Sequence, residues 1–178
     1  MHLKIIEFWF TEAGRSKWFI KNDAFDQHIR TRFAAVHAQA IQCELASWRC
    51  SALGSLAEII VLDQFSRNMF RGQPESFLYD PLALALAQNA IAKGLDVELS
   101  AEQQSFLYMP FMHSESLYIQ QQAEHLFTQL GIKDSLKFAL KHKAIIEQFG
   151  RYPHRNKILG RASTEEEKKF LLQSGSGF

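Results

Sequence analysis

The chain has 178 residues, of which 47% are hydrophobic and 22% charged, and 20 basic against 19 acidic residues give a formal net charge of +1. This composition predicts one globular domain and excludes a disordered chain, because 15 Phe and 3 Trp supply a large amount of apolar surface. A net charge near zero excludes the uniformly basic surface that drives binding to nucleic acids or membranes.

The near-zero total hides a local imbalance of charge. Residues 133–161 contain eight basic and two acidic residues, so the rest of the chain is acidic on balance. A local site for an anion in this segment is therefore compatible with overall neutrality.

We expect residues 1–10 not to be a signal peptide, because Lys4 and Glu7 interrupt their apolar residues. No uncharged run reaches the roughly 18 to 20 residues that span a bilayer. Cys43 and Cys50 match no redox or zinc spacing, and we expect both thiols to be reduced, with a disulfide between them as the alternative. We therefore expect a cytoplasmic protein with no membrane partner.

Helical periodicity dominates the first half of the chain. Apolar residues recur every three or four positions after the start signal Asn22–Asp23, which predicts an amphipathic helix containing Phe25, Ile29, Phe33, Val36 and Ala40. A wider apolar face predicts a central helix from about Ser51 to Arg67. Aromatic residues near the start predict a hydrophobic core built from Phe8, Trp9, Phe10, Trp18, Phe19, Phe25 and Trp48.

The second half is punctuated by start and stop signals for further helices. Asp80–Pro81 predicts an N-cap followed by proline at the first helical position, and Lys93–Gly94 predicts the end of that helix. Capping boxes beginning at Ser100 and Ser163 predict two more helices. Residues 117–130 and 135–149, joined by Gly131, predict a helical hairpin.

No segment alternates apolar and polar residues as a half-buried strand does. We therefore expect an all-α domain of about seven or eight helices packed as antiparallel pairs. This single domain is expected to cover residues 1–172, with a flexible tail at 173–178.

The first polar segment runs from Leu62 to Gly72. If the helix continues through it, Asp63, Arg67 and Arg71 lie four residues apart on one face. A carboxylate in this position can orient a guanidinium toward an anion. We count these three residues and Asn68 as candidate ligand-binding residues. The alternative is a surface ion-pair ladder that contributes less than about 1 kcal/mol.

The second polar segment runs from Phe149 to Arg161. Gly150 and Pro153 predict that the preceding helix ends here in a loop. Several side chains of this loop can bind phosphate or carboxylate, and we expect binding by Arg151, Arg155, Asn156 and Arg161, with His154 as a candidate acid or base. The alternative is a structural loop whose arginines bond to carbonyls at helix ends.

Two further features lie between these segments and beside them. His113 and Glu115 follow a predicted helix break and are candidate catalytic residues. The seven histidines show no metal-binding spacing, so we expect neither metal nor cofactor. Lys133, Lys137 and Lys141 form a stripe at helical spacing, which is typical of a solvated face but compatible with RNA or an acidic partner.

Together these motifs resemble a bacterial family known as domain of unknown function 924, placed in the tetratricopeptide-like helical superfamily. The resemblance covers nearly the whole chain. It rests on Glu7-Phe8-Trp9-Phe10, Trp18, Leu62-Asp63-Gln64-Phe65, Arg67-Asn68, Arg71-Gly72, Asp80-Pro81, Pro110, His113-Ser114-Glu115, His142, Phe149-Gly150-Arg151, Pro153-His154-Arg155-Asn156 and Leu159-Gly160-Arg161.

Ser66 and Tyr152 depart from the family pattern, which has Pro and Phe at these positions. The resemblance implies a tetratricopeptide-like helical fold, and it implies no reaction. The polar motifs are the family's own signatures, which favours a site over a core role for them.

The leading hypothesis is a site for a small anionic ligand where residues 63–71 meet residues 151–161, with enzymatic activity left open. Arg67, Arg71 and Arg155 would hold the anion, Asp63 would orient an arginine and His154 would donate a hydrogen bond or a proton. The alternative is an interaction module without catalysis that binds a peptide, such as an acidic one, in an open groove lined by aromatics and lysines. RNA binding through the lysine stripe is a weaker third hypothesis.

Overall fold

The computed structural model describes residues 1–177 and is helical throughout, with no strand in this range. Phe178, the last residue of the expected tail at 173–178, lies outside the described residues. The helices are α1 (His2–Glu7, continued by a π-helical segment, Phe8–Ala13), α2 (Arg15–Trp18), α3 (Asp23–Ile41), α4 (Ala52–Ile60, continued by a π-helical segment, Val61–Phe65), α5 (Ser66–Met69), α6 (Glu75–Leu78), α7 (Asp80–Ala92), α8 (Ala101–His113), α9 (Leu117–Leu130), α10 (Lys133–Phe149) and α11 (Glu165–Leu171). The predicted all-α class is confirmed.

Side-chain caps fix most of the predicted helix starts. The Asn22 side chain accepts a hydrogen bond from the Phe25 amide, and the capping box of Ser100 and Gln103 opens α8. The last box lies one residue later than predicted, with Thr164 as N-cap and Glu167 as its partner. Ser163 is not the cap because its hydroxyl accepts a hydrogen bond from the Asn156 side chain.

The predicted central helix is present and runs without a break from Ala52 to Met69 through α4, the π-helical segment and α5. Every residue from Gly54 to Ser66 is buried, which confirms its central position. The helix ends at Met69, so Arg71 lies beyond it and does not share a helical face with Asp63 and Arg67.

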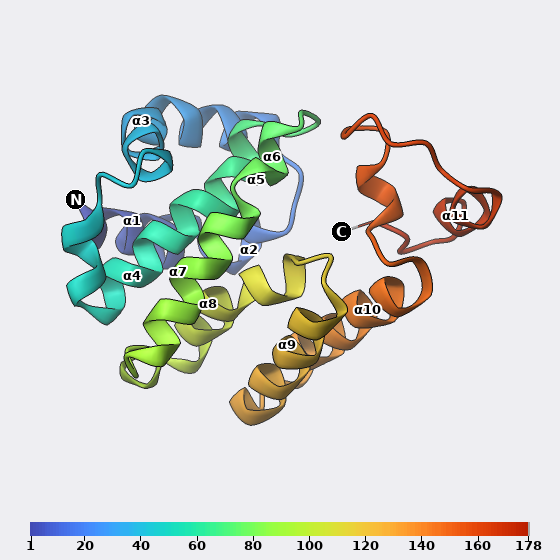
Figure 1. The fold of residues 1–178 in the computed structure, drawn as a ribbon. Coiled ribbons are helices and arrows are strands. Elements are labelled where there is room, and N and C mark those ends of the chain that lie inside the picture. The colour runs from blue at the N-terminus through green and yellow to red at the C-terminus, as the bar shows by residue number, and fades with distance from the viewer. Residues whose placement is uncertain (178) are drawn as a thin grey trace.

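The hairpin of α9 and α10 packs beside α8, and α7 packs on the other side against α8 and α4 (Figure 1). Gly131 takes the left-handed conformation at the hairpin turn, as predicted. The C-terminal segment, orange to red in Figure 1, leaves α10 at Gly150, and its Tyr152 packs with Ile145 and Ile146 of α10 in a small second apolar cluster. Among the described residues, no helix has the length and apolar character needed to span a membrane.

The aromatic cluster predicted near the start forms much of the main core. Phe8, Trp9, Trp18 and Phe25 are buried, and Trp18 donates its indole N–H to the Trp9 carbonyl oxygen. Phe19 is the exception, since it is 72% exposed at the end of α2. Both cysteines are free and exposed.

Candidate functional site

Asp80 joins the two polar segments that the sequence predicted. Its carboxylate accepts two hydrogen bonds from Arg67, at 2.9 and 3.0 Å, and one from Nη1 of Arg155 at 3.1 Å. The sequence predicted Asp80 as the N-cap of α7, and this prediction is wrong. Asp80 is the first residue of the helix, and no described side chain caps the helix start. The two guanidinium groups hold the carboxylate instead, because a charge-assisted, bidentate contact is stronger than a bond to a neutral amide.

Asp63 connects this arrangement to His113. Nδ1 of His113 donates to Oδ1 of Asp63 at 2.7 Å, and Arg67 Nη1 lies 2.9 Å from the same oxygen. Burial opposes ionisation of Asp63, but Arg67 and His113 outweigh it and hold the pKa of this carboxyl well below its usual value. Burial and then Arg67 lower the pKa of His113, so its ring is neutral at pH 7.

This tautomer leaves Nε2 of His113 as a hydrogen-bond acceptor, and it has no hydrogen-bond partner among residues 1–177. An imidazole oriented by a buried carboxylate can accept a proton at such an atom. Of the predicted catalytic candidates, His113 is thus the one whose hydrogen bonds leave a ring nitrogen, Nε2, in position to act as a general base.

Arg155 is buried at the centre of this junction. Its guanidinium lies over the rings of Phe77 and Tyr152, 4.5 and 4.6 Å from their centroids. Nη2 donates to the His113 carbonyl oxygen at 3.0 Å, whereas the buried Nε has no partner among the described residues. The Nε–H of Arg155 is therefore a buried donor that no described residue accepts from.

Glu115 and Arg161 form a second group, separate from Asp80. Arg161 makes a bidentate contact with Glu115 at 2.7 and 2.9 Å, and its Nε donates to Oδ1 of Asn156. Glu115 also accepts a hydrogen bond from the Tyr152 amide. Burial opposes ionisation of Glu115, but Arg161 lowers the pKa of its carboxyl. Glu115 is thus an ionised anchor for the C-terminal segment.

Two predicted arginines point away from the junction. Arg151 makes a bidentate contact with Glu167 of α11, which also accepts from Asn156. Arg71 makes a bidentate contact with Asp26 of α3 at 2.5 and 2.9 Å. Asn68 donates to the same Asp26 carboxylate. The eight predicted ligand-binding residues therefore divide among separate groups, and only Asp63, Arg67 and Arg155 meet at Asp80.

Two more histidines lie near the junction and stay neutral. Burial lowers the pKa of His142 to about 3 and that of His154 to about 4. The His142 ring lies 6.2 Å from His113 and 5.7 Å from Tyr152, and its Nδ1 donates to the Phe138 carbonyl oxygen. His154 is therefore a poor proton donor near pH 7, where the predicted role needs its protonated form.

Sequence reasoning missed the carboxylates and aromatics that complete these groups. Asp26 had a recognisable signal, because it is an acidic residue one turn before Ile29 on the apolar face of α3. Phe77 and Tyr152 carry no such signal, because a ring that stacks on an arginine cannot be distinguished by sequence from one in the core. Within residues 1–177, no three potential metal-ligating side chains gather into a site.

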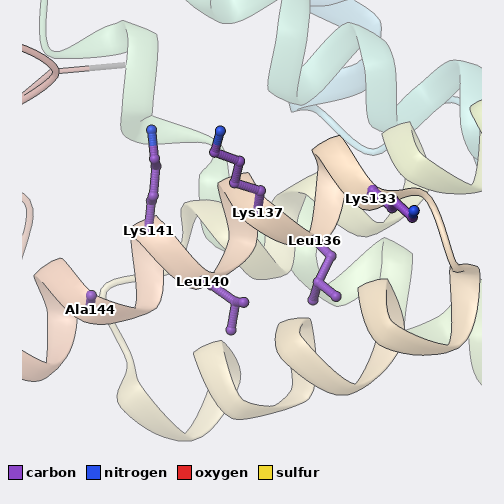
Figure 2. A pocket seen from close by; sticks show the side chains of 6 residues that line it. All are labelled: Lys133, Leu136, Lys137, Leu140, Lys141 and Ala144. Carbon is purple, nitrogen blue, oxygen red and sulfur yellow. The ribbon is translucent and has the colours of Figure 1, made fainter.

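Two open grooves are lined by residues of α9 or α10, and neither lining includes a residue of the junction. The first, of about 480 Å³, is lined only by α10 residues: Lys133, Leu136, Lys137, Leu140, Lys141 and Ala144 (Figure 2). The second, of about 610 Å³, lies between α7 and α9 and is lined by Gln88, Ile91, Ala92, Phe111, Tyr118, Gln121, Gln122, His125 and Leu126. We call them the α10 groove and the α7–α9 groove.

The family described as "Bacterial protein of unknown function (DUF924)" matches residues 5–175. The chain belongs to this family. The solved structure of a protein of unknown function, ATU0120 from Agrobacterium tumefaciens, is similar to it, with a TM-score of 0.92 and 43% sequence identity over 96% of each chain. No curated protein matches the chain. Membership confirms the resemblance and leaves the function to be argued from the residues.

Proposed function

We propose that this protein is a tetratricopeptide-like interaction module that binds a peptide segment of another protein in the α7–α9 groove, without catalysis. One observation carries the proposal. The predicted arginines are paired with carboxylates of the same chain, whereas open, largely apolar grooves lie on the helical hairpin.

The charge balance argues against a simple anion site at the predicted residues. Five arginines face five carboxylates: Arg67 and Arg155 with Asp63 and Asp80, Arg71 with Asp26, Arg151 with Glu167, and Arg161 with Glu115. An anion binding here would have to displace an internal carboxylate, which would then remain without its partner. Separating such a pair inside a protein is unfavourable.

The lining of the α7–α9 groove suits a peptide. Tyr118 is 68% exposed and offers an aromatic surface, while Ile91 and Leu126 add apolar contacts. Gln88, Gln121 and Gln122 each carry both a donor and an acceptor, so they can pair with the amides of an extended backbone. Helix α8 packs against both α7 and α9, its neighbours in the sequence, which supports the tetratricopeptide-like assignment.

A peptide-display selection tests the proposal. Peptides enriched on the wild-type protein should bind Tyr118→Ala and Gln122→Ala at least about tenfold more weakly, a loss of roughly 1.4 kcal/mol. Val97→Ala, an exposed position outside the groove, should bind them unchanged. Hydrogen exchange should show protection in α9. The proposal would be rejected if no peptide is enriched, or if the enriched peptides bind both groove variants as tightly as the wild type.

A second candidate function is a small-ligand site at the junction, favoured by Nε2 of His113 and Nε of Arg155, which have no hydrogen-bond partner among residues 1–177. A thermal-shift panel of phosphates, carboxylic acids, nucleotides and metals tests it. A ligand at a hundred times its dissociation constant stabilises by about 2.7 kcal/mol. His113→Gln should abolish that shift and the exposed His28→Gln should keep it. A panel with no shift on the wild type would eliminate this candidate.

A further inference from the structure

The α10 groove has the form of a helix-packing surface. Its lining residues form two rows with four-residue spacing, Lys133–Lys137–Lys141 and Leu136–Leu140–Ala144. Figure 2 shows Leu136 and Leu140 projecting to one side of α10 and Lys137 and Lys141 to the other. Rows of this spacing are the ridges that interdigitate when two helices pack. At 1.5 Å per residue the surface is about 16 Å long, or three helical turns.

The leucine row is incompletely covered by the rest of the protein. Leu136 is half-buried against the main core, but Leu140 is 42% exposed and the neighbouring Phe138 49% exposed. Burying such side chains stabilises a complex, whereas leaving them in water does not. Ala144 is small, so another backbone can approach this end of the row closely.

The lysine row carries charge that the chain does not neutralise. Lys133, Lys137 and Lys141 form no ion pair with any described residue, whereas Lys143 on the same helix contacts Glu124 and Glu147. Three ammonium groups beside an apolar row match a partner with carboxylates beside its own apolar row.

The lining also selects the partner's conformation. Leucine, alanine and the methylene stems of lysine offer a backbone no acceptors and no amide donors, unlike the glutamines of the α7–α9 groove. An extended peptide would bury unpaired main-chain groups here, whereas a helix satisfies its own.

We propose that the Lys133–Ala144 face of α10 binds an acidic amphipathic helix of another protein, with its apolar ridge in the groove and its carboxylates on the three lysines. This inference goes beyond the peptide groove proposed above and shares no lining residue with it. Each surface can therefore fail without the other. RNA would use the lysines but leave the leucine row without a role.

The test uses a designed 18-residue helical peptide with leucine along one stripe and glutamate on both flanks, measured by fluorescence anisotropy on the full chain. Lys137→Glu/Lys141→Glu should weaken binding at least about tenfold, and a lysine version of the peptide should restore it. Leu140→Ser should weaken binding about fivefold. Lys157→Glu/Lys169→Glu, an exposed pair matched in charge change, and Tyr118→Ala should leave it unchanged.

Three results would overturn the inference. The first is equal binding of a peptide whose leucines are replaced by serine, since charge alone would then explain it. The second is tighter binding of an RNA oligomer of equal charge. The third is self-association in light scattering that Lys137→Glu/Lys141→Glu abolishes, since the occupant would then be a second copy of this chain. Circular dichroism verifies that each variant is folded.

Discussion

Asp80 accepts hydrogen bonds from two arginines that lie 13 and 75 residues away in the sequence. Its carboxylate stands between two guanidinium groups whose side chains are mostly buried. Without that carboxylate, the two positive charges would face each other in a region of low dielectric constant. The residue therefore matters for stability more than an ordinary ion pair does.

Asp80→Asn should lower the free energy of unfolding by roughly 3 to 5 kcal/mol, because it leaves buried positive charge without a partner. Urea unfolding at pH 7 measures the change. The matched control is Glu12→Gln, which removes the partner of the more exposed Arg32 and should lower the free energy of unfolding by less than about 1 kcal/mol. Equal losses in the two variants would contradict the role given to Asp80.

Buried neutral histidines should make the protein sensitive to mild acid. Burial lowers the pKa of His37 to about 4, while the unfolded chain titrates near 6.5. As pH falls from 6.5 toward 4, the unfolded state binds a proton at His37 and the folded state does not. The free energy of unfolding therefore decreases over this range. His37 contributes about 1 kcal/mol per pH unit to this slope.

Urea unfolding between pH 7 and 4.5 checks the prediction with His37→Phe. This variant keeps a buried ring and loses the titrating group, along with the hydrogen bond to Ser66. Its free energy of unfolding should depend less steeply on pH by about 1 kcal/mol per unit. His28→Phe, at an exposed position, should keep the wild-type slope. An unchanged slope in His37→Phe would show that the burial of His37 does not control acid stability.

The sequence identified the polar residues that form ion pairs more successfully than it identified which residue each of them contacts. Asp63, Arg67 and Arg155 do meet, as their segments indicated, but Arg71 is held by Asp26 of α3. Such pairing depends on how helices distant in sequence pack, and one sequence carries no record of which acidic residue faces which arginine. The neutralisation of the arginines therefore became visible only in three dimensions.

At the scale of the element, the helix that starts after Ser51 depends on a glycine. A Cβ added to Gly54 would lie 2.1 Å from the carbonyl oxygen of Trp48, which is backbone and cannot rotate away. Gly131 differs, because nothing lies within 4 Å of an added Cβ and only its left-handed φ of 75° opposes substitution.

Gly54→Ala should therefore destabilise the protein by about 2 kcal/mol or more, through displacement of the 46–50 turn from α4. Gly131→Ala should destabilise by only about 1 kcal/mol, the strain of a left-handed alanine. Thermal or urea unfolding of the two variants gives the comparison. If Gly54→Ala proved as stable as Gly131→Ala, the 46–50 turn would be able to move away from α4 at little cost in free energy.

Helix positions were predictable because periodicity and caps are local signals. Asn22, Ser100 and Gly131 act as predicted, and the errors are of one or two residues. The π-helical segment at Val61–Phe65 was not predictable, because it arises where a buried helix adjusts to its neighbours. The end of the helix at Met69 was not predicted either. Because Arg71 lies beyond it, Arg71 contacts Asp26 of α3 and does not share a helical face with Asp63.

At the scale of the molecule, residues 150–171 complete the domain. They supply Arg155 for Asp80, Arg161 for Glu115 and Tyr152 for the second apolar cluster. A chain cut to 1–149 should lose its cooperative thermal transition, because it leaves Asp80 and Glu115 with fewer partners and exposes the cluster. A chain cut to 1–172 keeps all three residues and should melt cooperatively. Circular dichroism compares them, and a sharp transition in 1–149 would contradict this dependence.

The 75 residues between Asp80 and Arg155 also set an order of events during protein synthesis. A ribosome adds about 5 to 20 residues per second, so roughly 4 to 15 s pass between these two residues. During that interval the nascent helices contain Asp63 and Asp80 with Arg67 as their only arginine partner. Arg155 supplies the missing positive charge only after this interval, so the junction closes later than the pairing of Arg67 with the two carboxylates.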